Sequence, residues 1–358
     1  MMAAMRRRDW TFASRASILF ALLALLACAS SAELSAWHAA LLEADRLFDH
    51  ARDDDAARLA YLALQKEAPA PELERYIRYR LAALALRSGE PQRGVQLARE
   101  LVEEDSEPRD EWSSQALELL VQDAQARGGA DEAARLRSEL IARFPESSAA
   151  LDALEQVLAA FRARGDALGA VQWLADAYVS LSESGIGDNL LYEMALLQAE
   201  PLADPEGARQ SLEGMLARHP HSPLWDDARW RLAGWAQQAG ELREALRQYE
   251  KIAEQHDSSW SLGEYDSSLR DDAMEQRALI FVQLGELPAA VEEYDRVLAA
   301  YPEHWRAARF AYARAQLLRE LGEEQAWAEA LEALLQAHPE SVFAERAREC
   351  LAARGGAP

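Results

Sequence analysis

The sequence is poor in cysteine. Only Cys28 and Cys350 occur among its 358 residues and no CxxC pair is present, which excludes a thiolate zinc site. If Cys28 is removed with a leader or lipidated, the mature chain keeps one thiol and no internal disulfide. Its stability must then come from packing, and we interpret Cys350 as a small buried apolar residue on the last helix.

Basic residues are also scarce relative to acids. The chain has 38 Lys and Arg against 61 Asp and Glu, a formal charge of −23, and Lys66 and Lys251 are its only lysines. Proteins that bind nucleic acid backbones need clustered Lys and Arg, so this chain is a poor candidate for that class. If charge steers a partner toward this protein, that partner is cationic.

Residue patterns typical of catalysis are absent. The sequence has no GxSxG, no HExxH and no glycine-rich phosphate loop. His219 and His221 are separated by a proline and lack a spaced third ligand, so we interpret them as structural or solvated residues rather than a metal site. We therefore expect no enzyme activity, no cofactor and no bound metal.

A long hydrophobic run is lacking, and the nearest approach to one lies at residues 16–27, ASILFALLALLA. This run follows four arginines and precedes small residues, and it is shorter than the ~20 apolar residues of a transmembrane helix. We therefore interpret residues 1–32 as a secretory signal peptide and expect an exported protein. An uncleaved membrane anchor is the alternative.

The end of this signal has two interpretations. Leu25-Leu26-Ala27-Cys28 resembles the lipobox of bacterial lipoproteins, in which the cysteine is lipidated and becomes the first residue. Ordinary cleavage after Ala29 or Ala32 is the alternative, because small residues precede both positions. The first predicts a lipoprotein on the periplasmic side of the outer membrane, and the second predicts a periplasmic protein.

The rest of the chain is rich in helix formers and repeats itself. Alanine supplies 73 residues, and most repeats begin about 37 residues apart. The pattern is a glycine, a small residue five positions later, and a proline or serine twelve positions further on; six of the eight copies have the glycine, and the copy at Gly240 has Asp257 in place of the proline or serine. The copies begin at Arg52, Gly89, Gly128, Gly165, Ala203, Gly240, Gly285 and Gly322. A fixed period of this length is typical of helical repeat arrays.

Each column of the repeat suits a helical hairpin. The glycine can take the left-handed conformation that ends the first helix, here called helix A. An acid often follows, as in Gly240-Glu241, and favours the start of the second helix, helix B. The small residue lets helix B approach helix A closely, and the proline or serine ends helix B. The last copy has Trp327 instead of the small residue.

This pattern resembles the tetratricopeptide repeat, a helix-turn-helix unit of 34 residues, over residues ~38 to 341. The clearest matches to its signature are Leu232, Ala233, Gly240, Ala245, Tyr249 and Ile252 in one unit, and Ala278, Phe281, Gly285, Ala290, Tyr294, Val297 and Pro302 in the next. The resemblance implies an all-α fold, an α-solenoid of about eight hairpins over residues 33–341. Residues 342–358 are predicted to form a capping helix and a tail.

The junctions between units carry a further resemblance. Phe144-Pro145-Glu146-Ser147 and His219-Pro220-His221-Ser222 are similar to the YPxS junctions of outer-membrane β-barrel assembly lipoproteins and of the periplasmic Tol–Pal coordinator. This similarity implies a place in the bacterial cell envelope. His219, His256 and His338 take the same junction position as Phe144 and Tyr301, which indicates a packed ring.

The family resemblance also implies where partners bind, because positions 2, 5, 9, 12 and 13 of helix A line a concave groove. Aromatic residues beside acids suit a peptide there. An unusually long junction, residues 260–270, is either a binding loop or a tolerated insertion. The candidate partner-binding residues are Tyr76, Tyr79, Glu118, Gln122, Glu155, Glu193, Trp230, Gln237, Trp260, Tyr265, Glu275, Arg309 and Tyr312.

We interpret the protein as a non-catalytic scaffold for protein–protein interactions in the cell envelope. We expect protein or peptide partners, no nucleic acid, and membrane contact only through a lipid on Cys28. A periplasmic module that binds peptidoglycan or a small ligand is the alternative.

The lipidation hypothesis predicts the effect of Cys28→Ala. Removing the acceptor thiol should release the protein from the membrane fraction into the soluble periplasm. Cell fractionation and mass spectrometry of the mature N-terminus measure this outcome. Unchanged fractionation together with an unmodified N-terminus in the wild type would contradict it.

Overall fold

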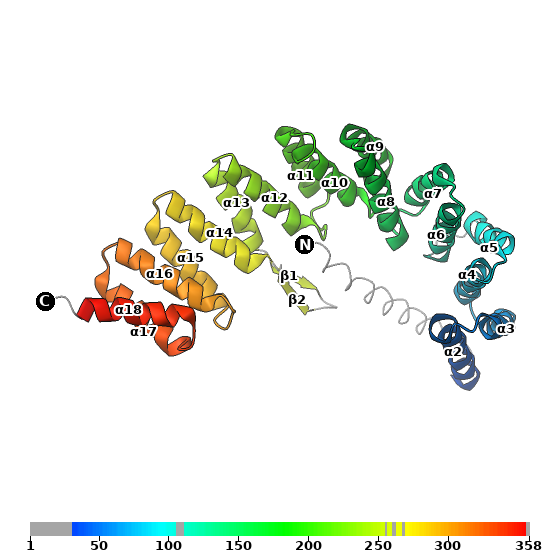
Figure 1. The fold of residues 1–358 in the computed structure, drawn as a ribbon, viewed down its shortest axis with the longest axis horizontal. Helices are drawn as coiled ribbons and strands as arrows, with labels where there is room; N and C mark the ends of the chain where they lie inside the picture. The colour runs from blue at the N-terminus through cyan, green and yellow to red at the C-terminus, as the bar shows by residue number, and fades with distance from the viewer. Residues whose placement is uncertain (1–30, 105–110, 255, 260–262, 267–268, 356–358) are drawn as a thin grey trace. The chain divides into compact units, whose positions relative to one another are not determined.

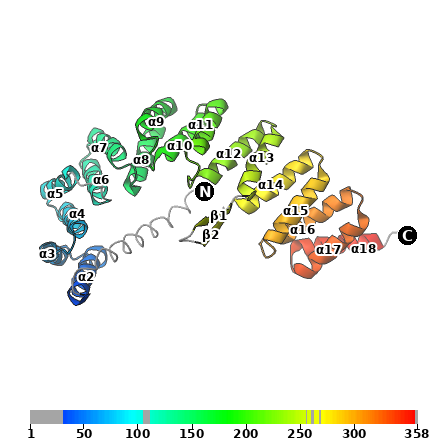
Figure 2. The same ribbon diagram turned by 180° about the vertical axis from the view of Figure 1, so that it is seen from behind.

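The computed structural model describes residues 31–104, 111–254, 256–259, 263–266 and 269–355. Cys28 and the predicted signal peptide up to Ser30 lie outside these residues. Within each of its two compact units the described chain consists of helices that follow one another as antiparallel neighbours, and the second unit also has one short pair of strands (Figures 1 and 2). The predicted all-α solenoid of helical hairpins is confirmed.

The helices belong to two compact units, which we describe separately. In the first unit each helix contacts the next, and α4 also contacts α6, which contacts α8. Its elements are α2 (Ser31–Arg46), the π-helix η1 (Leu47–Ala51), α3 (Asp54–Gln65), α4 (Pro71–Arg87), α5 (Pro91–Glu103), α6 (Glu111–Ala126), α7 (Ala130–Arg143) and α8 (Ser148–Arg164).

The second unit begins with α9 and ends with α18, and again each helix contacts the next. Its elements are α9 (Ala167–Leu181), α10 (Gly187–Ala199), α11 (Pro205–Arg218), α12 (Trp225–Gln238), α13 (Leu242–Glu254), β1 (His256–Ser259), β2 (Gly263–Asp266), α14 (Arg270–Gln283), α15 (Leu287–Ala300), α16 (Ala307–Glu320), α17 (Glu324–Ala337) and α18 (Val342–Gly355). The even-numbered helices from α2 to α16 are helix A of the predicted hairpins, and the odd-numbered ones from α3 to α17 are helix B.

A left-handed residue separates helix A from helix B at every predicted repeat start. All six glycines of this column have positive φ, between 68° and 82°. Arg52 and Ala203, which replace glycine in the other two copies, are the only described non-glycine residues with positive φ, at 52° and 51°. The turn therefore requires this conformation whether or not the residue is suited to it.

The small residue five positions later is buried in every hairpin that has one. Ala57, Ala133, Ala208, Ala245 and Ala290 are fully buried, and Ala170 is nearly so. Gly94 occupies this position in α5, where a Cβ atom would lie 2.6 Å from Leu86 Cγ and 2.9 Å from the Leu86 amide nitrogen. Helix B thus approaches helix A too closely there for any larger side chain.

The residue after the turn caps helix B. The carboxylates of Asp53, Asp166 and Asp204 accept hydrogen bonds of 2.9–3.1 Å from the backbone N–H three residues further on. Glu286 and Glu323 occupy the same N-cap position of α15 and α17. The three aspartates therefore cap helix B, whereas Glu286 and Glu323 make no side-chain hydrogen bond to it and contribute only a negative charge at the predicted position.

Four of the five predicted junction rings cap helix B at its other end. Phe144, His219, Tyr301 and His338 each donate their backbone N–H to the carbonyl four residues earlier. The prediction for His256 was wrong, because this residue begins β1. There the chain leaves the repeat pattern after α13 and returns to it at α14.

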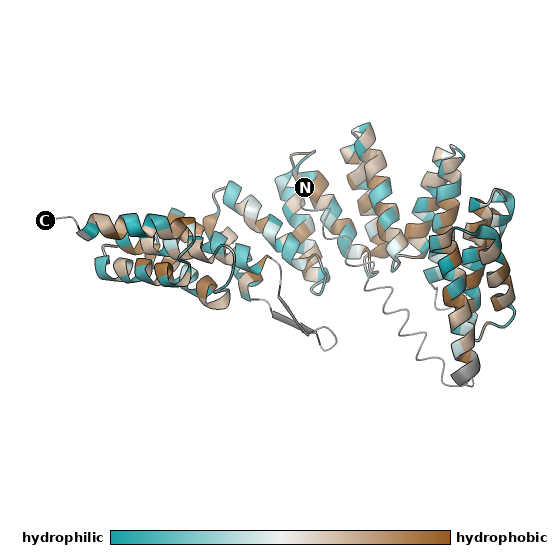
Figure 3. Cartoon of the chain, turned by 60° about the horizontal axis from the view of Figure 1, so that its bottom comes forward, coloured by the Kyte–Doolittle hydropathy of each residue, from teal (hydrophilic) through white to brown (hydrophobic). Residues whose placement is uncertain are grey.

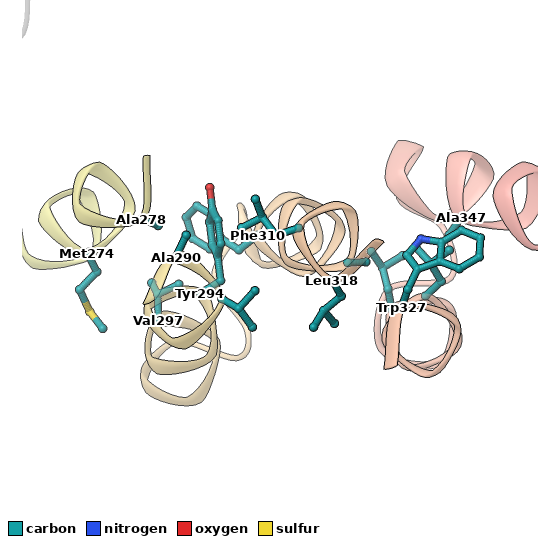
Figure 4. Packing of buried hydrophobic residues seen from close by; sticks show 14 of the residues in the cluster. Met274, Ala278, Ala290, Tyr294, Val297, Phe310, Leu318, Trp327 and Ala347 are labelled. Carbon is teal, nitrogen blue, oxygen red and sulfur yellow. The ribbon is translucent and has the colours of Figure 1, made fainter. Parts of the chain in front are cut away.

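Buried apolar residues of helices A and B form the core within each unit. Hydrophobic and hydrophilic residues alternate along the helices (Figure 3). In the second unit, Tyr294 of α15 packs against Phe310 of α16 with ring centroids 6.2 Å apart, and Val297 lies beside them (Figure 4). Neighbouring hairpins therefore share one core, which is how a solenoid buries apolar surface that a single hairpin would leave in water.

The last hairpin departs from this pattern because of Trp327. Its side chain is buried beside Ala347 of α18, which confirms the predicted capping helix (Figure 4). Ala344 and Ala347 of this helix are fully buried, whereas Val342 at its start is 56% exposed. The small residues of α18 leave the room that the indole occupies.

The long junction folds as a β-hairpin rather than as an irregular loop. Strands β1 and β2 pair antiparallel, with His256 opposite Asp266 and Ser259 opposite Gly263. The insertion thus begins at His256, four residues earlier than the sequence suggested. Of the two candidates there, Trp260 lies outside the described residues and Tyr265 is placed in β2 by its backbone alone.

The turn geometry predicts opposite effects for two substitutions in the second unit. Gly285→Ala should destabilise the protein by about 1 kcal/mol, because the left-handed conformation is unfavourable for an L-residue. Ala203→Gly should stabilise it by up to about 1 kcal/mol for the same reason. Urea denaturation of the purified protein measures both changes.

Gly234→Ala provides the control, because Gly234 lies inside α12 without a positive φ, and a Cβ added there would have no atom within 4 Å. Alanine should stabilise that helix by about 0.5–1 kcal/mol. Equal effects of Gly285→Ala and Gly234→Ala would show that the turn does not impose the conformation.

Candidate binding surfaces on helix A

The first unit places several candidate residues on one face. Because α4, α6 and α8 contact in sequence, their outward sides form a continuous surface, which we call the N-terminal surface. It includes Tyr76, Tyr79 and Arg80 of α4, Trp112, Glu118 and Gln122 of α6, and Asp152 and Glu155 of α8. These side chains are half-buried or exposed, so the surface is open to a partner.

A hydrogen-bonded network anchors one edge of this surface. The Asp45 carboxylate accepts hydrogen bonds from the hydroxyls of Tyr61, at 2.5 Å, and Tyr76, at 2.6 Å. Arg80 donates to the Tyr76 hydroxyl and, at 3.1 and 3.2 Å, to Asp49. Burial raises the pKa of both tyrosines well above its usual value, and Asp45 adds to the effect. Tyr76 is therefore fixed in place and its hydroxyl is occupied.

An aromatic cluster adjoins the network. The Trp112 ring lies 4.7 Å from that of Tyr76 and 5.8 Å from that of Tyr79, measured between centroids. Both tyrosines were predicted from the sequence, whereas Trp112 was missed. If Glu118 takes position 9 of its helix A, Trp112 takes position 3, which the family pattern does not assign to the groove. A tryptophan in the first turn of helix A was the signal that could have found it.

Carboxylates occupy the other edge. Glu118 accepts a hydrogen bond of 3.1 Å from Gln122, and no described cation pairs with it. Burial, reinforced by the negative charge of Asp152, raises the pKa of Glu118. Burial also raises the pKa of Tyr79, and the charge of Glu118 contributes. The charge of Glu118 therefore acts on the Tyr79 hydroxyl, and Glu155 is exposed on α8.

In the second unit the candidate side chains of α10 and α12 are half-buried, and one of them packs against another helix of the fold. Trp230 is half-buried and packs edge-on against Tyr249 of α13, its own helix B, at 5.0 Å. Glu193 and Gln237 are half-buried as well. Packing against Tyr249 explains why a tryptophan occupies position 230. Binding of a partner by Trp230 stays a prediction.

Two other candidates bind each other. Glu275 of α14 is 9% exposed and forms ion pairs with Arg309 and, at 2.8 Å, with Arg306. Arg306 also lies 2.6 Å from Asp272 and pairs with Asp271. Because its partners lie within the fold, Glu275 stabilises the junction of α14 with α16, and it offers little free charge to a ligand.

Tyr312 is covered by the capping helix. Its ring lies 5.6 Å from Phe343 of α18, and its hydroxyl lies 3.9 Å from the Cys350 sulfur. Burial raises the pKa of Tyr312. The sequence could not show this contact because α18 follows the repeats and lies outside their register.

A cavity of about 650 Å³ opens between α13, α14 and α15, and Arg277 and Arg296 line it. Arg296 donates a hydrogen bond of 3.0 Å to buried Glu293, and Arg277 forms an ion pair of 3.1 Å with the same oxygen. Burial raises the pKa of Glu293 in spite of these two cations. The two arginines therefore offset the negative charge of buried Glu293. We assign no ligand and no reaction to this cavity.

The described residues hold neither a cluster of metal ligands nor a membrane-spanning helix. Within them, no three His, Cys, Asp or Glu side chains gather closely enough to hold a metal ion. No helix in residues 31–104, 111–254 or 269–355 combines the length and apolar character needed to cross a membrane.

The tetratricopeptide repeat family model matches residues 272–304, which form most of α14 and all of α15. The family resemblance is supported there by an independent comparison. No curated protein matches the sequence.

Among solved structures, the chain is similar to MamA at 18% identity, over 50% of this chain and 93% of that one, with a TM-score of 0.34. It is similar to pilF of Pseudomonas aeruginosa at 14% identity, over 66% and 96%, with a TM-score of 0.35. A tetratricopeptide repeat protein of Parabacteroides merdae has 15% identity over 88% and 98%, with a TM-score of 0.26.

The network predicts that Asp45→Ala destabilises the protein by about 2 kcal/mol, because two tyrosine hydroxyls lose their acceptor and Tyr61 is fully buried. Thermal and urea unfolding measure the loss. Glu43→Ala is the control on the same helix, since Glu43 pairs only with exposed Arg46 and its removal should leave stability unchanged. A neutral result for both variants would refute a structural role for the network.

Proposed function

We propose that this protein is a non-catalytic scaffold that binds segments of partner proteins on its N-terminal surface. Tetratricopeptide repeat proteins bind protein or peptide partners and are generally not enzymes, and a unit of this kind is matched here at residues 272–304. The observation that carries the proposal is the contact of the Trp112 and Tyr79 rings on adjoining A helices, together with the negative charge of Glu118 that acts on Tyr79. Aromatic anchors beside charged groups are the residues that dominate protein interfaces.

The shape of a helix face favours this function over catalysis. The polar groups of the N-terminal surface are spread along α4, α6 and α8 rather than directed at one reacting atom. Such a row can contact several residues of an extended or helical segment at once. The excess of acids on the chain supports partners that carry positive charge.

We also propose that the scaffold works in the bacterial cell envelope and that Cys28 carries a lipid anchor. The support is the basic start, the apolar run 16–27 and the sequence Leu25-Leu26-Ala27-Cys28. The unit junctions that begin Phe144-Pro145 and His219-Pro220 add the resemblance to envelope proteins.

Site-specific photo-crosslinking in cells tests the scaffold function. A photoreactive residue in place of Gln122, which is exposed on helix A next to Glu118, should capture a discrete partner protein. Gln96 is the matched control, because it is exposed on helix B of the preceding hairpin and bonds to a glutamate in the same way.

Capture from position 122 and not from position 96 would support binding on the N-terminal surface. Equal capture from both positions would mean that contact is not confined to helix A. Failure to capture any protein from position 122 would count against the scaffold.

A further inference from the structure

The N-terminal surface contains one group of side chains whose polar atoms the fold leaves unused. Trp112 and Tyr79 are half-buried, with rings 5.8 Å apart and inclined by 30°. The Trp112 indole N–H and the Tyr79 hydroxyl make no hydrogen bond with any described residue. Both rings are therefore held in position while part of each stays open to a ligand.

Glu118 lies on α6 six residues after Trp112, and its charge contributes to raising the pKa of Tyr79, yet no described cation pairs with it. Its only described hydrogen bond comes from the neutral amide of Gln122, and no described arginine or lysine pairs with it. Asp152 brings a second negative charge close enough to raise the pKa of Glu118 beyond the effect of burial. A half-buried carboxylate in this state is stabilised by any cation that reaches it.

Arg80, which follows Tyr79 on α4, is already bound within the fold. Arg80 is held by two hydrogen bonds to Asp49 and by one to the Tyr76 hydroxyl, and its guanidinium lies 4.5 Å from the Phe48 ring centroid. The fold thus satisfies the neighbouring acids and leaves the carboxylate of Glu118 unpaired.

We infer that Trp112, Tyr79 and Glu118 bind one arginine side chain of a partner protein segment, an inference that rests on the proposed function. A planar guanidinium stacks on aromatic faces and donates paired hydrogen bonds to a carboxylate. An acidic side chain of the partner would be repelled by the negative charges of Glu118 and Asp152. An apolar side chain would remove water from the Glu118 carboxylate without pairing its charge, which is unfavourable. Arginine fits all three groups.

N-acetyl-arginine amide is a suitable probe for the full-length mature protein. Titration should shift the indole N–H signal of Trp112 saturably in a ¹⁵N NMR spectrum, with the signal assigned by a Trp112→Phe variant. N-acetyl-citrulline amide has nearly the same shape without the charge and should bind about tenfold more weakly or not at all. Trp305, which is 84% exposed beside Arg306, is the internal control and should not shift.

Glu118→Gln should weaken binding of the arginine probe about tenfold. Its melting temperature should equal or exceed that of the wild type, because the neutral amide removes a half-buried charge next to Asp152. Loss of binding therefore cannot be attributed to unfolding. Glu100→Gln, on the exposed face of helix B, is the matched control and should bind as the wild type does.

Equal binding of the arginine and citrulline probes, or undiminished binding by Glu118→Gln, would overturn the inference. The scaffold proposal is judged separately by crosslinking from position 122. Capture of a partner without arginine binding would leave the scaffold standing and remove the arginine site.

Discussion

The close approach of helix A to helix B in the hairpins that lie within one unit is the constraint on which the rest of the structure depends. Helix B follows helix A after a single left-handed residue, and five positions later its backbone lies against helix A. At Gly94 even one additional carbon would collide with Leu86. This spacing fixes where the apolar faces meet and therefore which side of helix A remains open to a partner.

Local chemistry explains why the hairpins could be predicted from the sequence. A glycine at a turn, a small residue in the interface and an acid at a helix start each act within a few residues of their own position. Even Arg52 and Ala203, which lack the expected glycine, take the left-handed conformation because the neighbouring helices require it. The β-hairpin after α13 and the exposure of Val342 were not foreseen, because neither follows the repeat.

The candidate site was predicted less completely than the fold. Repeat positions identified Tyr79 and Glu118, and the charge of Glu118 contributes to raising the pKa of Tyr79. The repeat positions could not show which candidate side chains are already engaged by contacts within the protein. Glu275 is neutralised by arginines more than thirty residues away, and Tyr312 lies under a helix outside the repeats. Whether a group is free depends on such distant partners, and one helix's sequence does not contain them.

Trp327 also limits how the array can change. In the other hairpins the equivalent position holds alanine or glycine, so those units present similar interfaces to their neighbours. The indole of Trp327 instead fills a space bounded by Ala347 of α18, with Arg319 and Arg354 near its ring. An internal hairpin placed before α18 would leave that space empty. The final hairpin and its cap are therefore a matched pair, and a duplication that lengthens the solenoid must occur upstream of them.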